Sequence, residues 1–205
     1  MKKRVIFGVI FFGMLIVVSG CGGNKGSKIV VDRYSANTLS DTTRDLYLQK
    51  INHVRQQSQD CGLEGILGPV GDLNWSVDLY GAAAEHNADM MSIHEGNITK
   101  LGTGGPSDHT AQANHLGHPS SVGERLRTNG YSYSVARQNV HAGSDIKTID
   151  DVLAAWLTEP NACKNLMNSD VTEMGLSHDQ NNSSTYTHYW TIELAKPAQE
   201  EKGYF

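Results

Sequence analysis

The first twenty-one residues constrain the rest of the chain most, because they do not have the pattern of a globular domain. Three basic residues precede an uncharged apolar stretch, Val5–Val18, and two small residues lead directly into Cys21. A basic head, a short apolar stretch and a small-residue cleavage site are typical of a secretory signal. The stretch is shorter than the roughly 18 apolar residues that a membrane-spanning helix needs. We therefore predict that residues 1–20 are a signal peptide outside the fold.

The cysteine makes this signal more specific. The run Val18-Ser19-Gly20-Cys21 resembles the bacterial lipobox, in which the cysteine is acylated and becomes the new N-terminus after cleavage. The resemblance implies attachment to a membrane through acyl chains on Cys21. In a Gram-negative host, Gly22 at the next position implies transport to the outer membrane. An ordinary signal with a chance cysteine, or a short uncleaved anchor, is the alternative.

The processed chain is acidic. Without the basic residues at positions 2–4 it keeps 14 basic against 22 acidic residues, a formal charge of −8. This charge leaves no electrostatic footprint for nucleic acid, so a nucleic-acid partner is not expected. The chain also lacks a polybasic patch for anionic lipid, so attachment to a membrane has to come from the acyl chains.

The composition after Cys21 divides the chain into three parts. Residues 21–40 are rich in Gly and Ser and are predicted to be the lipidated N-terminus and a flexible tether. Residues 41–197 are long enough for one ordinary domain. Residues 198–205 form a polar tail.

Helical signals dominate the first part of this domain. Apolar residues recur at helical spacing over 47–54 and, as a longer stripe, over 79–90. Ser121 and Glu124 form a capping-box pattern, and Gly130 is a stop signal. A fourth helix is predicted to begin after Thr148 and to end before Pro160, with the apolar stripe Ile149, Val152, Leu153 and Trp156.

The period changes to two near the C-terminus. Apolar and polar residues alternate over 186–194, which predicts a half-buried strand. Residues 171–176 are a plausible partner strand, and the turn-rich segment 178–184 would close an antiparallel hairpin. Helices followed by a hairpin indicate the α+β class, with helices packed on a small sheet.

Three cysteines are present, and lipid attachment at Cys21 leaves Cys61 and Cys163. An exported protein meets an oxidising compartment, so this pair is predicted to form a disulfide. Two buried free thiols, or intermolecular pairing, are the alternatives.

Five sequence blocks, in order, resemble the CAP superfamily of cysteine-rich secretory, antigen 5 and pathogenesis-related-1 proteins in its bacterial form. They are LNWSVDLYGAAAEHNADM at 73–90, GERLRTNGY at 123–131, RQNVHAG at 137–143, VLAAWLTEPNACKNLMNSDVTEMGL at 152–176 and YWTIELAKP at 189–197. The resemblance covers most of residues 44–195. It implies a three-layer α-β-α sandwich of CAP type, and it supports the pairing of Cys61 with Cys163.

The departures from this family concern its cleft. Many members line a central cleft with two histidines and one or two glutamates that can hold a divalent metal. By this resemblance, Lys100 and Ala162 stand where histidines are expected, and Gln138 stands where a glutamate is expected. Ala has no donor atom, Gln has no charge and a protonated Lys repels a cation, so no metal and no cofactor are predicted there. Glu159 is either an acidic remnant of the cleft or a solvent-facing residue at a helix end.

Other polar residues border the same region or lie apart from it. Asn139 follows Gln138 and is assigned to the cleft, together with His188 on the Trp190 face of the predicted strand. Packing is the favoured interpretation for His188, and His141 is a further candidate to border the cleft. His86 lies on an apolar helix stripe and is predicted to be a core histidine. Three histidines, His109, His115 and His118, lie in a polar loop at 95–120, either as metal ligands or as incidental surface residues.

The sequence favours a binding role over catalysis. It has no G-x-S-x-G nucleophile elbow and no phosphate-binding loop, so no catalytic residue is assigned. The leading interpretation is a non-enzymatic binding module on the cell envelope, with a protein, a lipid or a cell-wall glycan as its partner. A metal-dependent envelope hydrolase with a rebuilt site, and a carrier of sterol or fatty acid, are the alternatives.

Attachment can be tested directly. Cys21→Ser removes the only thiol that the lipobox pattern offers for acylation, so the variant should accumulate as unprocessed precursor and lose acyl labelling in cells. Normal processing and labelling of Cys21→Ser would show that the lipoprotein interpretation is wrong.

Overall fold

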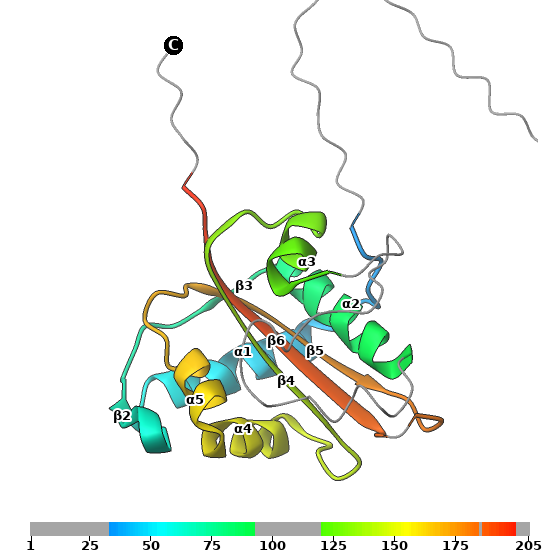
Figure 1. Cartoon of the computed structure of the whole chain (residues 1–205). Coiled ribbons are helices and arrows are strands. Elements are labelled where there is room, and N and C mark those ends of the chain that lie inside the picture. Colours follow the sequence, from blue (N-terminus) through cyan, green and yellow to red (C-terminus); the bar gives the residue numbers. More distant parts are fainter. Residues whose placement is uncertain (1–32, 93–119, 185, 200–205) are drawn as a thin grey trace, which may run out of the picture. The chain divides into compact units, whose positions relative to one another are not determined.

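A four-stranded sheet with the strand order β3-β5-β6-β4 is the middle layer of the fold (Figure 1). The computed structural model describes residues 33–92, 120–184 and 186–199. Helices α1, α4 and α5 cover one face of the sheet, and α2 and α3 cover the other. The elements are α1 (Asp41–Arg55), β1 (Gln59–Asp60), the 3-10 turn η1 (Gly62–Glu64), β2 (Ile66–Leu67), β3 (Asn74–Trp75), α2 (Val77–Ser92), α3 (Val122–Thr128), β4 (Tyr133–Gly143), α4 (Ile149–Thr158), α5 (Pro160–Leu166), β5 (Glu173–Gln180) and β6 (His188–Pro197). The predicted α+β class and three-layer sandwich are confirmed.

The predicted C-terminal hairpin is formed by β5 and β6, but β6 is not half-buried as predicted. β6 pairs antiparallel with both β5 and β4, and its residues 188–195 are all buried. The reason is that helices cover both faces of the sheet. Trp190 packs edge-on against Tyr47 of α1, while Ala195 packs on the opposite face against Leu79 of α2. β5 also runs on to Gln180, so the turn begins later than predicted.

The predicted helix ends follow the capping chemistry. In α3, Ser121 accepts from the backbone N–H of Glu124, and the Glu124 carboxylate accepts from the backbone N–H of Ser121. Thr148 and Asp151 make the same box at the start of α4. Gly130 adopts a φ of 93° after α3, a conformation that favours glycine.

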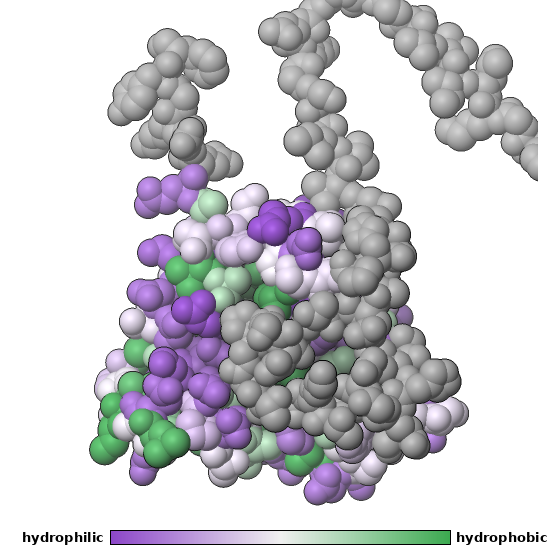
Figure 2. Space-filling view, viewed as in Figure 1, coloured by the Kyte–Doolittle hydropathy of each residue, from purple (hydrophilic) through white to green (hydrophobic). Residues whose placement is uncertain are grey.

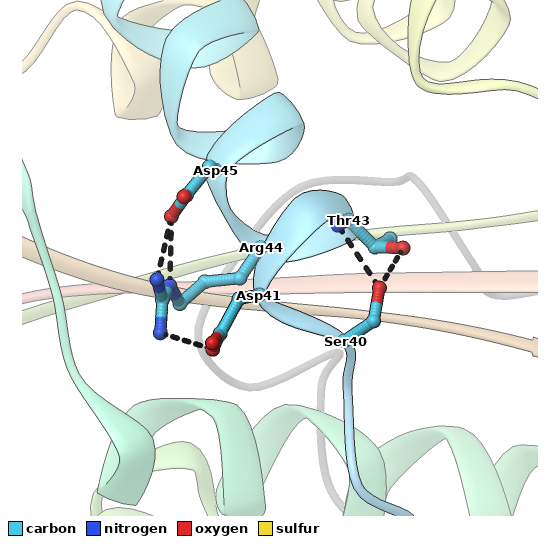
Figure 3. A network of polar contacts seen from close by, with 5 residues as sticks. All are labelled: Ser40, Asp41, Thr43, Arg44 and Asp45. Carbon is cyan, nitrogen blue, oxygen red and sulfur yellow. Dashed lines mark hydrogen bonds and ion pairs between the residues drawn. The ribbon is translucent and has the colours of Figure 1, made fainter.

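The first turn of α1 is fixed by a small polar network (Figure 3). The Ser40 hydroxyl accepts from the backbone N–H of Thr43, which satisfies one of the free donors of the helix end. The Arg44 guanidinium lies between two carboxylates, at 2.8 Å from Asp41 and 2.8 Å from Asp45. These ion pairs are exposed, so they favour the local geometry more than the overall stability.

Pro160 ends one helix and begins another. Its ring disfavours helical backbone in the preceding residue, and Glu159 is extended with a φ of −94° and a ψ of 115°. Pro160 then occupies the first turn of α5, where a missing N–H costs nothing. The predicted end of α4 is therefore correct, and α5 is a further helix that was not predicted.

A glycine in the sheet allows a helix to pack closely on it. A Cβ added at Gly175 of β5 would lie 2.0 Å from the backbone nitrogen of Tyr80, so α2 packs directly on the strand at this glycine.

Residues 33–40, which were predicted to be part of the tether, belong to the folded unit. Arg33 lies 3.0 Å from Asp78 of α2, and Tyr34 donates its backbone N–H to Asn129.

Cys61 and Cys163 form the predicted disulfide. The bridge joins η1 to α5 and is itself buried beside Met167. No helix within the described ranges has both the length and the apolar character needed to cross a membrane.

Reducing this disulfide should lower the stability of the domain. The bond closes a loop of 102 residues, and loss of such a constraint costs about 4.7 kcal/mol in the chain-entropy model. We expect dithiothreitol to lower the urea midpoint of the wild-type protein, but not that of the Cys61→Ala/Cys163→Ala double variant, which is the control. Complete alkylation of both thiols in the native protein without reductant would contradict the bridge.

Candidate functional site

A cavity among the described residues follows the outer edge of the sheet. It has a volume of about 910 Å³ and is open to solvent. One wall is β4, which among the described strands pairs only with β6 and is therefore an edge strand. The other walls come from α3, from the end of α4 and from α5 with the turn that follows it. The lining residues are Val122, Gly123, Tyr133, Ser134, Val135, Ala136, Arg137, Gln138, Asn139, Val140, His141, Ala155, Trp156, Thr158, Glu159, Asn161, Ala162, Lys164, Asn165, Asn168 and Asp170.

Side chains cover the outward carbonyls of β4. The main-chain oxygen of Ala136 accepts from the Arg137 guanidinium at 2.7 Å. The oxygen of Gln138 accepts from the Asn165 amide at 3.2 Å. The oxygen of Val140 accepts from the Trp156 indole N–H at 3.2 Å. Three successive acceptors on this free edge are therefore occupied by the protein's own donors.

Asn139 joins β4 to α5. Its amide nitrogen donates to the backbone oxygen of Ala162 at 2.9 Å, and its amide oxygen accepts from Asn165 at 2.9 Å. The side chain of Asn139 is only 2 % exposed. Both ends of this amide therefore link β4 to α5, so the wall of the cavity is fixed before a ligand binds.

The structure brings some of the predicted cleft residues together and separates others. Asn139, Glu159 and Ala162 line the one cavity. Gln138 borders it through its backbone, but its side chain points to the opposite face of β4 and donates to Glu193 at 2.5 Å. Successive side chains of a strand point to opposite faces of the sheet, so Gln138 and its neighbour Asn139 cannot both face the cavity. Lys100 lies outside the described residues.

His188 lies elsewhere, in a pair of histidines at the β5–β6 end of the sheet. The His178 Nε2 and His188 Nδ1 atoms lie 3.0 Å apart and share a hydrogen bond. His178 also stacks on Trp190, with ring centroids 3.8 Å apart. Burial, together with the nearby His188, lowers the pKa of His178 to about 4. His188 thus packs in this group and is not among the residues that line the cavity.

The remaining histidines differ in their placement. His141 borders the cavity, and burial lowers the pKa of its imidazole. His86 is a buried residue of α2, as expected. His109, His115 and His118 lie outside the described residues. Among residues 33–92, 120–184 and 186–199, no three His, Cys, Asp or Glu side chains are grouped closely enough to hold a metal ion.

Two charges of each sign are found among the described residues that line the cavity. Arg137 and Lys164 are the basic residues, and Glu159 and Asp170 are the acidic ones. The Lys164 ammonium is paired with Glu64 at 2.7 Å. The cavity therefore does not select strongly for an anion or a cation.

The aliphatic hydroxyls of the wall are occupied by backbone groups. Ser134 donates to the carbonyl of Pro197 at 3.2 Å, and Thr158 donates to that of Ala155 at 2.8 Å. Neither is hydrogen-bonded to a histidine or a carboxylate among the described residues. A hydroxyl nucleophile needs such a base to be activated.

A buried carboxylate lies behind the cavity, under α2 and α3. Glu193 is fully buried, with Arg125 close by and the amide of Gln138 in contact. Burial raises the pKa of Glu193 to about 8, although Arg125 and the hydrogen bond from Gln138 both act to lower it. At neutral pH the protonated form of this side chain is therefore favoured.

The protein is therefore an α-β-α sandwich with a cavity beside its edge strand β4. The family model described as the cysteine-rich secretory protein family, CAP, matches residues 48–194, and the chain belongs to this family. No curated protein matches the chain.

Solved structures are similar to this chain, and the first of the two described here shares its fold. An outer surface protein of Borrelia burgdorferi is 15 % identical with a TM-score of 0.52, and the match covers 79 % of this chain and 97 % of that one. An extracellular protein of Bacillus anthracis with an SCP domain is 19 % identical with a TM-score of 0.47, and the match covers 78 % of this chain and 45 % of that one. At these identities the likeness concerns the fold alone.

Sequence reasoning missed the residues that build the cavity wall. Asn165 holds the β4 edge, and Trp156 was predicted only as part of an apolar helix stripe. The spacing of Asn161 and Asn165, four residues apart, is the one signal in the sequence that places two amides on the same helix face.

The buried carboxylate gives a pH-dependent prediction. The folded state keeps a proton on Glu193 that the unfolded chain releases above about pH 4.5, so the free energy of unfolding falls as the pH rises from about 4.5 to 8. Glu193→Gln removes this loss. We expect the stability of the variant relative to wild type to increase across this range by up to about 1.4 kcal/mol per pH unit.

Chemical denaturation at several pH values would measure this difference. The contribution of His178 is present in both proteins and cancels in the comparison. Asp170→Asn, which removes an exposed carboxylate, is the control for the loss of a carboxylate. A difference between Glu193→Gln and wild type that stays constant from pH 4.5 to 8 would contradict a raised pKa.

Proposed function

We propose that this protein is a non-enzymatic binding module, attached to the cell envelope through Cys21, that holds its ligand in the cavity along β4. The observation that carries the proposal is the wall of that cavity. Its aliphatic hydroxyls donate to backbone carbonyls, the amide of Asn139 fixes its shape, and its described lining has two charges of each sign. Such a site is preformed for binding and contains no nucleophile paired with a base among the described residues.

The envelope location is supported by the signal and the cysteine that follows it. An outer surface protein is also among the structures similar in fold, although that name describes the Borrelia protein alone. In a Gram-negative host the processed chain would lie at the outer membrane.

The two alternative functions fit the cavity less well. A metal-dependent hydrolase needs a set of ligands, and the described lining offers Glu159, Asp170 and His141 without grouping them. A sterol or fatty-acid carrier needs a predominantly apolar pocket, whereas polar and apolar groups contribute about equally to the surface of this cavity.

The proposal predicts that blocking the cavity abolishes binding without affecting attachment. Asn161 is an exposed residue of the wall, so Asn161→Trp should fold normally and fill part of the cavity. The full chain in detergent would be incubated with envelope material separated into peptidoglycan, lipid and protein fractions. We expect wild type to be retained by one fraction, and Asn161→Trp to be retained at least roughly tenfold less.

Asn182→Trp, at an exposed asparagine in the β5–β6 turn and outside the cavity, is the matched control. It should be retained like wild type, and acylation of all three proteins should be equal. Release of soluble fragments from any fraction by the wild-type protein would contradict a non-enzymatic role. Equal retention of Asn161→Trp and wild type would contradict the assignment of the cavity.

A further inference from the structure

We infer that the ligand of the β4 cavity is a linear, uncharged glycan that carries hydroxyl and acetamido groups. This inference rests on the proposed function and names its ligand class. It follows from four properties of the cavity: its length, its closed strand edge, its charge and its amide side chains.

The wall of the cavity on β4 is long. It runs from Tyr133 to His141, and eight residue steps of a strand span about 26 Å. At 910 Å³ the cavity is at the upper end of the range for small-molecule sites. A ligand that uses this whole length is a chain of several units rather than a single compact molecule.

A peptide that adds to the sheet as a further strand does not fit this edge. Strand addition needs free backbone donors and acceptors on the edge strand. The oxygens of Ala136, Gln138 and Val140 already accept from three side chains of the protein. An added strand would have to displace all three donors, one of which is the buried Trp156 indole. Coverage of an edge in this way protects a sheet against strand pairing.

The electrostatics favour a ligand without net charge. The described lining contains two basic residues, Arg137 and Lys164, and two acidic ones, Glu159 and Asp170, and the pairing of Lys164 with Glu64 leaves no excess of positive charge there. A phosphate-rich or polyanionic ligand would need an excess of basic side chains. In the space-filling view, hydrophilic residues also gather over α5, whereas an apolar patch lies at the lower left, over β2 (Figure 2). The wall of the cavity is thus suited to a neutral and polar chain.

Amide side chains line the wall opposite β4. Asn161 and Asn165 lie one turn apart on α5, about 6 Å along its axis, and Asn168 follows just after the helix. Asn165 is used to hold β4, but Asn161 makes no side-chain hydrogen bond within the described part of the chain. Asn168 uses only its amide oxygen, toward the backbone N–H of Asp170.

Each free amide group offers donors, and Asn161 also offers an acceptor. A sugar hydroxyl both donates and accepts, and an acetamido group carries one N–H and one carbonyl. A chain of N-acetylated sugars therefore repeats the chemistry that Asn161 and Asn168 can pair with. Apolar lipids lack these groups, and charged headgroups would add a charge that the site does not balance.

Chitohexaose, a linear chain of six N-acetylglucosamine units, is the probe. Calorimetric titration of the full chain in detergent should show saturable binding. Asn161→Leu keeps the size of the side chain but removes its amide, and we expect it to weaken binding roughly tenfold at an unchanged melting temperature. Asn182→Leu, outside the cavity, should bind like wild type.

Several outcomes would overturn the inference. Failure of chitohexaose to bind at millimolar concentration, while retention by an envelope fraction still depends on Asn161, would reject the glycan but leave the proposed function standing. An uncharged hexapeptide that competes for the site at lower concentration would assign the cavity to peptides instead. Equal affinity of Asn161→Leu and wild type for chitohexaose would place glycan binding outside the cavity. Absence of both chitohexaose binding and envelope retention would remove the proposed function as well.

Discussion

The cavity depends on a few hydrogen bonds from helical side chains to the free edge of the sheet. Asn165 and Trp156 each donate to a carbonyl of β4, and Asn139 donates back to α5. An edge strand normally exposes unpaired backbone carbonyls, with which a strand of another chain can pair. Here these bonds cover the edge and, by the same contacts, fix the separation between β4 and α5. One set of interactions therefore both protects the sheet and forms the wall of the site.

The rest of the fold positions this wall. β6 is buried on both faces, so the sheet is rigid at its centre and β4 has one fixed neighbour. Pro160 turns the chain between α4 and α5, which brings Trp156 and Asn165 to the same edge from two different helices. The disulfide then ties α5 to the 3-10 turn after α1. Glu193, buried on the opposite face, lowers the stability as the pH rises and is not among the residues that line the cavity.

Much of the architecture could be predicted from local signals in the sequence. Capping residues such as Ser121 and Thr148 mark helix starts because their chemistry is local. The family blocks predicted the three layers, and the cysteine count in an exported protein, supported by those blocks, predicted the pairing of Cys61 with Cys163. β4 could not be found from periodicity, because its centre carries the polar run Arg137, Gln138 and Asn139, of which two side chains are buried. Burial of β6 on both faces likewise depends on helices far away in the sequence.

The site was only partly predictable for the same reason. Matching positions to a family placed Gln138 in the cleft, whereas strand alternation turns its side chain toward Glu193. A hydrogen bond between a helix and a strand edge cannot be recognised from the sequence of either segment alone. The sequence therefore did not indicate that Asn165 contacts β4.

The central claim is that a ligand meets the α5 amides and leaves the β4 edge covered. Side-chain and backbone amide NMR signals of the full chain in micelles, recorded during a chitohexaose titration, test it most directly. The account predicts shifts for the side-chain amides of Asn161 and Asn168, with the Trp156 indole N–H still hydrogen-bonded. Release of that indole together with shifts of the Ala136 and Gln138 backbone amides, or no shift at Asn161 at saturation, would contradict it.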